Sequence, residues 1–407
     1  MEAGAATNAI HQGQRCHTLG KVITSGRATD GMRLRCTSVQ RGAGEALVWQ
    51  YHGPTKGTAR KSCVILDNDF DIDDLMAIPV VLGSKHVAAI VQSEGYTTPA
   101  HAAPAVDRLV NHIPDRPRGR QVPIIVGGEQ ATSPDLTPWP WLPFFRSMMN
   151  RSNGLLTSVP APWPTSGHYK HQVARSVAHC ESVSILIIGT YTSFNNYLPL
   201  IKQKVDRVVV MGQSIGDHSR TQGRESFNCR YDLDACRSAM PMLARLKTYF
   251  VEIPRFDDCH DKVQPPTHCY TPNEAMVTGR RAATGSRVGG LRRHGLPGHL
   301  RSALVNKIAC SAFYTTPATK GRPCSSRSTW EPGAVAKGPG GEMLLWDQTA
   351  AMFLVQPQAF SLYYPPGHPE LGGKHYEPHL VNGSDAQTVQ KLRRMWTRFS
   401  NKSALVR

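Results

Sequence analysis

The chain has 407 residues, of which 40% are hydrophobic, so it is long enough to bury a substantial core. Neither a membrane-spanning run nor a secretory signal is visible, which excludes an integral membrane protein and leaves the cytoplasm as the expected location. The formal net charge of +17 suggests nucleic acid, but the basic residues lack interleaved aromatics and match no nucleic-acid module, so we expect no specific nucleic-acid partner.

Residues 1–60 differ from the rest of the chain. They are rich in Gly, Thr, Arg and Gln, they carry eight Lys or Arg against three acidic residues, and they show no sustained apolar period. We therefore predict a disordered basic extension over residues 1–60 and a single catalytic domain over residues 61–407.

From residue 61 onward, short apolar runs alternate with helical or loop stretches. The runs that we expect as strands cover residues 64–66, 87–91, 123–126, 184–188 and 207–211. This alternation predicts the α/β class, with a Rossmann-like, mostly parallel central sheet that is flanked by helices.

An acidic cluster follows the first of these runs, where five aspartates fall within eight positions: Asp67, Asp69, Asp71, Asp73 and Asp74. Asp67 and Asp69 are two residues apart at the carboxyl end of a strand, so they project to the same side. Asp73 and Asp74 open a helix expected over residues 74–82, and they face the first pair across the crevice where α/β sheets bind ligands. Because these carboxylates repel one another, a hard divalent cation is the natural counter-charge.

Two other functions would use a similar cluster of aspartates. An EF-hand loop is excluded, because Ile72 would stand where Gly is required and Ile78 where Glu is required. An Asp-x-Asp pair after a strand also suits a phosphatase with an aspartate nucleophile, which stays open as a lesser alternative.

The spacing Asp67-x-Asp69-x-x-x-Asp73-Asp74 resembles the signature of the inosine-uridine nucleoside hydrolase family. Further blocks follow in the family's order, similar to its Gly-Pro-Leu-Thr, Met-Gly-Gly, Glu-Phe-Asn-x-x-x-Asp and Trp-Asp segments, at residues 188–192, 208–212, 225–232 and 344–347. The resemblance spans roughly residues 60–380 and implies the nucleoside hydrolase fold.

The resemblance also implies a metal site. It assigns Ca²⁺ to Asp69, Asp74, Asp347 and the backbone carbonyl of Thr192, which are all oxygen donors of the kind that calcium prefers. Asp69 would in addition take a proton from a metal-bound water, and Asp73 would hold ribose hydroxyls.

The remaining substrate contacts are implied in the same way. Asn228 would hold the sugar from the other side, Glu94 and Met211 would lie near the substrate, and Glu225 would reach the 5′-hydroxyl. Trp346 occupies the place where pyrimidine-active relatives carry a histidine, so the chain resembles the purine-preferring branch, in which an indole stacks on the base. The alternative interpretation is that Trp346 only packs in the hydrophobic core.

The implied function is hydrolysis of purine ribonucleosides to ribose and free base, with a small-molecule substrate, a role in nucleoside salvage, and a homodimer or homotetramer as the assembly. Three departures from the family pattern keep open a diverged member that binds a riboside or another sugar derivative without turnover. They are an extra residue between Glu225 and Asn228, Gln213 in place of a Gly, and Ser193 in place of an Asn.

The ten cysteines form no C-x-x-C pair, so we expect reduced thiols, several of them buried. Cys259-His260 and His268-Cys269 form the one arrangement that suggests zinc, although a Pro-rich loop with incidental ligand types is the simpler interpretation.

Two further segments carry expectations. Residues 279–301 are basic and are interpreted as a solvated insertion or a lid near the substrate. Trp139 and Trp141 lie in a Pro-rich aromatic stretch that would supply a second stacking face for the base or an apolar contact between subunits.

Overall fold

The computed structural model of the protein describes residues 15–25, 32–41, 44–54, 60–111, 121–129, 142, 161–212, 226–251, 346–363, 374–377, 391–392, 394–396 and 398–399. None of the helices within these ranges combines the length and the hydrophobicity that crossing a bilayer requires.

The main sheet has eight strands in the order β10-β11-β9-β8-β7-β4-β5-β6. In chain order, these strands are β4 (Arg60–Asn68), β5 (Val87–Gln92), β6 (Ile124–Val126), β7 (Cys180–Ile187), β8 (Val205–Met211), β9 (Thr248–Val251), β10 (Ser361–Tyr363) and β11 (Lys374–Glu377). Every neighbouring pair is parallel except β10 with β11. The five predicted strands are confirmed as β4 to β8, and the predicted α/β fold is confirmed with them.

The path of the chain creates a crevice at the centre of this sheet. From β4 the chain moves outward to β5 and β6, and it then returns to the other side of β4 to form β7. The strand order therefore reverses between β4 and β7. Open α/β sheets bind their ligands outside the carboxyl ends of the strands at such a reversal.

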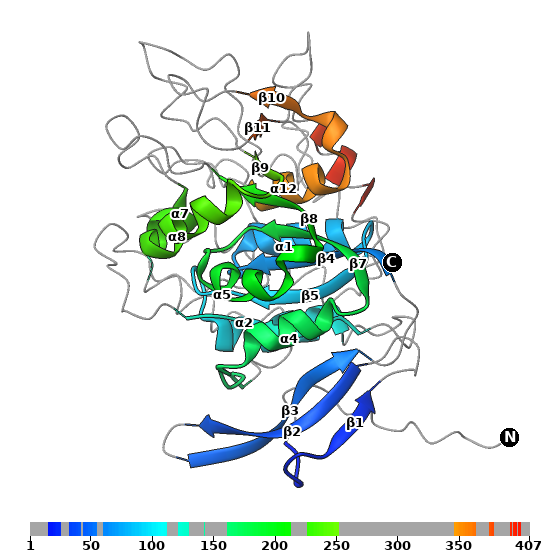
Figure 1. The fold of residues 1–407 in the computed structure, drawn as a ribbon, viewed down its shortest axis with the longest axis vertical. Helices are drawn as coiled ribbons and strands as arrows, with labels where there is room; N and C mark the ends of the chain where they lie inside the picture. The colour runs from blue at the N-terminus through cyan, green and yellow to red at the C-terminus, as the bar shows by residue number, and fades with distance from the viewer. Residues whose placement is uncertain are drawn as a thin grey trace, which may run out of the picture.

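Helices cover both faces of the sheet (Figure 1). The described helices are α1 (Ile72–Leu82), α2 (Pro99–Asn111), α4 (Tyr169–Ser176), α5 (Thr192–Ile201), α7 (Phe227–Tyr231), α8 (Leu233–Leu243) and α12 (Trp346–Val355), with short 3₁₀ turns η2 (Lys202–Lys204) and η5 (Pro357–Ala359). Val64 and Leu66 of β4 pack in the core with α1, α2 and α12, whereas Cys63 and Ile65 pack in the core with α4, α5 and α8. This alternation follows from the two-residue period of a strand.

A second, smaller sheet precedes the main one. Strands β1 (Val22–Ser25), β2 (Met32–Arg41) and β3 (Gly44–Pro54) pair in antiparallel order, and they lie below α4 in Figure 1, at the end of the molecule opposite β10 and β11. The side chains buried in it include Leu34, Cys36, Trp49 and Tyr51.

This small sheet corrects the expected disorder of residues 1–60 for the part that the structure describes. A sheet that buries one face needs an apolar side chain at every second position only, as at Leu34 and Cys36. Its strands therefore contain no continuous apolar run that would predict them from the sequence. The disulfide between Cys16 and Cys36 adds a covalent restraint.

The expectation of reduced thiols is also wrong for the described cysteines. Disulfides join Cys16 to Cys36, Cys63 to Cys180, and Cys229 to Cys236, over separations of 20, 117 and 7 residues. The longest of these connections exists because β4 and β7 are neighbours in the sheet, a fact of topology that the spacing of cysteines does not encode. The remaining four cysteines, at positions 259, 269, 310 and 324, lie outside the described residues.

Candidate active site

Three elements converge at the carboxyl edge of the central strand. Strand β4 ends beside Asp67 and Asp69, α1 carries Asp73 and Asp74 in its first turn, and α12 carries Asp347 in its first turn. Helices α1 and α12 pack against each other, and hydrogen bonds between their first turns bring their amino ends together at this edge. Carboxylates at these positions also suit the positive ends of the two helix dipoles.

Asp73 holds the start of α12 in place. Its Oδ2 accepts hydrogen bonds from the backbone N–H groups of Trp346, at 3.1 Å, and Asp347, at 3.2 Å. The first amides of a helix have no partner within the helix, so an acceptor from a neighbouring element stabilises its amino end. A side chain of α1 thereby brings Trp346 and Asp347 to the edge where β4 ends.

The aspartates are buried beside one another. Asp69, Asp73, Asp74 and Asp347 are 1%, 8%, 0% and 2% exposed. Burial raises the pKa of all four carboxyls, and the pKa of Asp69 reaches about 6. Repulsion from the neighbouring aspartates raises the pKa of Asp74 and Asp347 further. In the described structure, the charged groups that act on these two carboxyls are therefore all negative. A positive charge beside these carboxyls would favour their ionised form and lower their pKa values.

Two carboxylate oxygens in this group accept no hydrogen bond from the described residues. They are Asp74 Oδ1 and Asp347 Oδ1, both of them buried. Unsatisfied buried oxygens are costly unless a ligand engages them. A set of hard oxygen donors with these properties fits a divalent cation such as Ca²⁺.

The loop after β5 fixes the position of Asp69. Its Oδ2 accepts a hydrogen bond from the backbone N–H of Tyr96 at 2.9 Å, and its carbonyl oxygen accepts one from the Thr97 hydroxyl at 2.8 Å. A Cβ atom on Gly95 would lie 2.0 Å from Asp69 Oδ2, so only glycine leaves room for this carboxylate. Phe70 follows with φ of 58°, a strained value for a bulky residue of the kind that clusters at functional sites.

Asp67 belongs to a separate polar network beneath the cluster. Its Oδ1 accepts a hydrogen bond from the Ser93 hydroxyl at 2.5 Å, and the Ser193 hydroxyl lies 2.7 Å from that of Ser93. Ser193 also accepts the backbone N–H of Gly128 at 2.9 Å. Burial raises the pKa of Asp67 to about 7, against the lowering effect of the Ser93 hydrogen bond. The network ties the ends of β4, β5 and β6 to the start of α5.

Polar and aromatic side chains lie around the same edge. Glu94 Oε1 accepts the hydroxyl of Tyr231 at 2.9 Å, and Asn228 Nδ2 donates to the carbonyl of Ile188 at 2.9 Å. The rings of Tyr96 and Phe227 are 4.4 Å apart, and those of Phe227 and Tyr231 are 5.5 Å apart, so an aromatic row leads away from the acidic group.

Residues 64–401 match the model of the inosine-uridine preferring nucleoside hydrolase family. The chain belongs to this family. Membership makes it a relative of hydrolases that act on nucleosides, and it supports a divalent metal ion in the site. No curated protein sequence matches the chain.

Solved structures of nucleoside hydrolases are similar to the chain at low identity. A purine-preferring ribonucleoside hydrolase from Gardnerella vaginalis has 14% identity and a TM-score of 0.49, with 83% of this chain and 99% of that chain covered. An inosine-uridine preferring nucleoside hydrolase from Bacillus anthracis has 12% identity and a TM-score of 0.47, with 84% and 99% covered. An inosine-guanosine nucleoside hydrolase has 12% identity and a TM-score of 0.48, with 82% and 98% covered.

The structure brings together most of the acidic residues that the nucleoside hydrolase signature indicated. Asp69, Asp73, Asp74 and Asp347 shift one another's pKa values and so form one group. Thr192 differs, because its carbonyl accepts a hydrogen bond from Asn196 at 2.8 Å and its hydroxyl donates to Asp232, which is not a member of this group.

The predicted substrate residues are spread around this group. Glu94 follows β5, Met211 ends β8, Asn228 lies on α7, and Trp346 begins α12. Met211 and Trp346 both pack with the core formed by α1, α2 and α12. Other expectations fall outside the described residues: Glu225, Gln213, the Trp139 and Trp141 stretch, the Cys259-His260 and His268-Cys269 pairs, and residues 279–301.

Two tyrosines at the site, Tyr96 and Tyr231, were given no role by the sequence analysis. Tyr96 lies beside the acidic group, where its backbone N–H donates to Asp69, and burial together with the nearby aspartates raises the pKa of its hydroxyl well above the usual range. Tyr231 binds Glu94. The only signal in the sequence was their position, two residues after Glu94 and three after Asn228, which identifies no function by itself.

Proposed function

We propose that the protein is a Ca²⁺-dependent ribonucleoside hydrolase with a preference for purine nucleosides. The observation that carries the proposal is the buried group of aspartates from β4, α1 and α12, with oxygens that accept no hydrogen bond in the described structure. Family membership supports hydrolysis of the bond between the sugar and the base.

Asp69, Asp74 and Asp347 would hold the cation, because each is buried and because Asp74 and Asp347 each have one oxygen that accepts no hydrogen bond. When bound, Ca²⁺ would supply positive charge that favours the ionised form of the group, and it would lower the pKa of a coordinated water molecule. The carbonyl of Thr192 would complete the set through the lone pair that Asn196 leaves unused.

Different aspartates of the chain would then act on the attacking water and on the sugar. Asp69, which the N–H of Tyr96 orients, would accept a proton from the attacking water. Asp73 would bind ribose hydroxyls, while its Oδ2 also holds α12. The carboxylates together stabilise the positive charge that develops at C1′ as the bond to the base breaks.

Asn228, Glu94, Met211 and Glu225 would make the remaining substrate contacts. The bond from Asn228 Nδ2 to Ile188 fixes the orientation of the amide, and Tyr231 orients Glu94. Because two side chains are already held in place, little rotamer entropy is lost when the sugar binds.

Trp346 supports the preference for purines. It begins α12 beside Asp73, it is partly buried, and its indole Nε1 has no hydrogen-bond partner in the described structure. An indole face that stacks on a purine contributes about 1 kcal/mol beyond the area that it buries. A larger base gains more from this contact than a pyrimidine does.

Assembly and location complete the proposal. We propose a homodimer or homotetramer, which light scattering would measure. The cytoplasmic location stays a prediction, and the three disulfides favour an oxidising compartment instead. Labelling of free thiols in protein taken directly from cells would distinguish the two.

The test is release of ribose from inosine, adenosine, guanosine, uridine and cytidine, with and without a chelator. The proposal requires ribose from the purine nucleosides that disappears on chelation and in Asp69→Ala. Binding of inosine with no ribose would instead support a diverged riboside-binding protein, which the Ser193 and Gln213 departures favour. Orthophosphate released from phosphomonoesters would support the phosphatase alternative.

A further inference from the structure

A second group of metal-binding side chains lies at the opposite edge of the sheet. Cys63 lies in the first half of β4, Cys180 is the first residue of β7, and His86 and His179 immediately precede β5 and β7. Strands β7, β4 and β5 are parallel neighbours, so their amino ends share one edge. The acidic group lies beyond their carboxyl ends, and Cys63 is already about 13 Å from Asp67 along β4 at roughly 3.3 Å for each residue.

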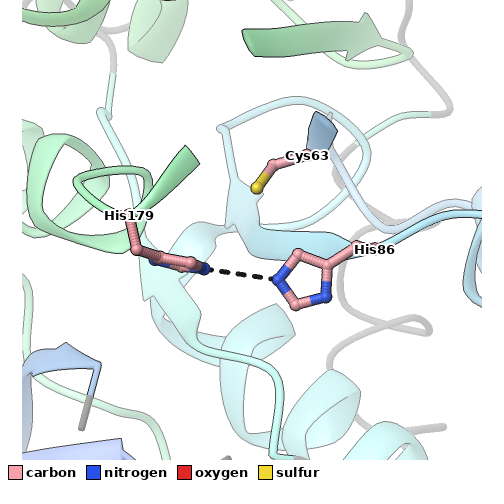
Figure 2. Close-up of side chains that lie close together, drawn as sticks. All are labelled: Cys63, His86 and His179. Atoms are coloured by element: carbon pink, nitrogen blue, oxygen red, sulfur yellow. Dashed lines mark hydrogen bonds between the residues drawn. The ribbon is translucent and has the colours of Figure 1, made fainter. Parts of the chain in front are cut away.

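The side chains of this group face one another. One ligand atom each from Cys63, His86 and His179 lies within 4.8 Å of the others, and Figure 2 shows the two imidazoles pointing at each other with the Cys63 sulfur beside them. Cys180 offers a fourth donor beside this group, because its sulfur is bonded to that of Cys63 and lies 3.9 Å from His179 Nε2.

The spacing of the nitrogens matches a metal-bound pair. The two Nε2 atoms are 3.4 Å apart, which is long for a hydrogen bond, and the rings meet edge to face at 82°. In a tetrahedral Zn²⁺ site, two nitrogen ligands lie about 3.3 Å apart, and a nitrogen and a sulfur lie about 3.5 Å apart. The observed distances of 3.4 and 3.9 Å are close to both values.

We propose that Cys63, Cys180, His86 and His179 form a tetrahedral site for a thiophilic divalent metal ion, represented by Zn²⁺, when the Cys63–Cys180 disulfide is reduced. A dithiol reductant supplies two electrons and two protons, so that it becomes a disulfide and the cystine becomes two thiols. The metal ion then displaces one proton from each thiol and binds both thiolates and two neutral imidazoles. Each sulfur moves by about 0.9 Å, since two thiolates on one Zn²⁺ lie about 3.8 Å apart.

The surrounding backbone is already organised for this site. The carbonyl of His86 accepts the N–H of Val64 at 2.8 Å. Lys204 Nζ donates to the carbonyls of Val177, Ala178 and Cys180, which fixes the turn that carries His179. Such supporting contacts hold ligands in place before the metal ion arrives.

The cysteines and the histidines of the site differ in their exposure to solvent. Cys63 is 0% exposed and Cys180 is 3% exposed, whereas both histidines are only partly buried. A metal ion therefore reaches the site from the histidine side, and the thiolates bind it from the protein interior. Sulfur and nitrogen donors select a different class of ion from the oxygen donors of the acidic group.

The proposal is tested with the full chain, reduced with a dithiol and desalted without oxygen. Alkylation and mass spectrometry verify that Cys63 and Cys180 are free thiols, and Co²⁺ is then added as the spectroscopic probe. We expect one tightly bound Co²⁺ with a thiolate charge-transfer band and the intense bands of tetrahedral geometry, and we expect Zn²⁺ to displace it. The oxidised chain should bind at least about 100-fold more weakly, because each sulfur is then bound to the other instead of to the metal.

Variants assign the signal to these residues. His86→Gln and His179→Gln should each weaken binding at least about 100-fold, and they leave both cysteines in place. Three matched controls should keep the signal: His168→Gln for a histidine outside the group, Cys229→Ser with Cys236→Ser for another disulfide, and Cys259→Ser with Cys269→Ser for the other Cys/His segment.

Three results would overturn the proposal. One is a disulfide that the dithiol cannot reduce in the folded chain. Another is verified reduction without the charge-transfer band. The third is an unchanged band in both histidine variants, which would place the bound ion elsewhere.

Discussion

The two edges of the parallel sheet differ in chemistry although they share one strand. At the carboxyl edge, β4 leads into buried aspartates that offer only oxygen donors. At the amino edge, the same strand places Cys63 beside two histidines and a second cysteine. In this sheet the direction of the strands separates the two kinds of ligand, because helix amino ends gather at the carboxyl edge and favour carboxylates there.

The two edges also differ in what they require. The aspartates repel one another and keep oxygens that accept no hydrogen bond in the described structure, so under the proposed function that edge depends on an added cation. The amino edge is already joined by a disulfide between β4 and β7. Substitutions or metal removal at the carboxyl edge should therefore abolish activity. The same changes at the amino edge should leave activity in place.

The largest effect is expected from Asp69→Ala. It removes a carboxylate that both binds the cation and accepts a proton, so ribose release from inosine should fall at least about 1,000-fold. The matched control is Asp234→Asn, at an exposed position of α8, which should keep full activity. Retention of more than a tenth of the activity in Asp69→Ala would remove this residue from the chemistry.

The second-largest effect is expected from removal of the metal ion, which should affect the carboxyl edge and not the amino edge. A calcium-selective chelator should abolish ribose release and lower the melting temperature, since a ligand at 100 times its dissociation constant stabilises the fold by about 2.7 kcal/mol. Added Ca²⁺ should restore both activity and melting temperature. Activity that survives chelation would contradict a metal-dependent carboxyl edge.

A smaller effect is expected from Gly95→Ala. The new Cβ would lie 2.0 Å from Asp69 Oδ2, so the carboxylate must move, at a cost of about 1–3 kcal/mol. Affinity for Ca²⁺ should fall by about 10-fold or more by calorimetry. Gly167→Ala is the matched control, because nothing lies within 4 Å of its added Cβ. Equal affinities in the two variants would show that the tight approach of Gly95 does not position Asp69.

The smallest effect is expected from Trp346→Phe. A smaller ring stacks less well on a purine, so kcat/KM for inosine should fall about five-fold relative to that for uridine, which corresponds to about 1 kcal/mol. Trp49→Phe, in the small amino-terminal sheet, should change neither value. Parallel losses for inosine and uridine would assign Trp346 to packing alone.

Much of the fold followed from local patterns. Continuous apolar runs are typical of strands buried on both faces, and five of them became β4 to β8. The helix expected over residues 74–82 begins slightly earlier, at Ile72. The small sheet was missed because alternation such as Leu34-x-Cys36 is a weak signal within a basic, Gly-rich segment.

The site was predictable only in part, for a different reason. Aspartates within one motif share a turn of chain, so their proximity follows from spacing. The capping of α12 by Asp73, the bond from Tyr231 to Glu94, and the pairing of Cys63 with Cys180 all join residues that only the topology brings together. Spacing carries no information about such contacts, so they had to come from the structure.

Calorimetric titration of Ca²⁺ into the wild-type chain and into Asp69→Asn, Asp74→Asn and Asp347→Asn tests the central claim most directly. The account predicts one Ca²⁺ for each chain, and an affinity at least about 100-fold weaker in every variant, because all three carboxylates surround the same ion. Wild-type affinity in Asp347→Asn would contradict the convergence of β4, α1 and α12 on a single metal site.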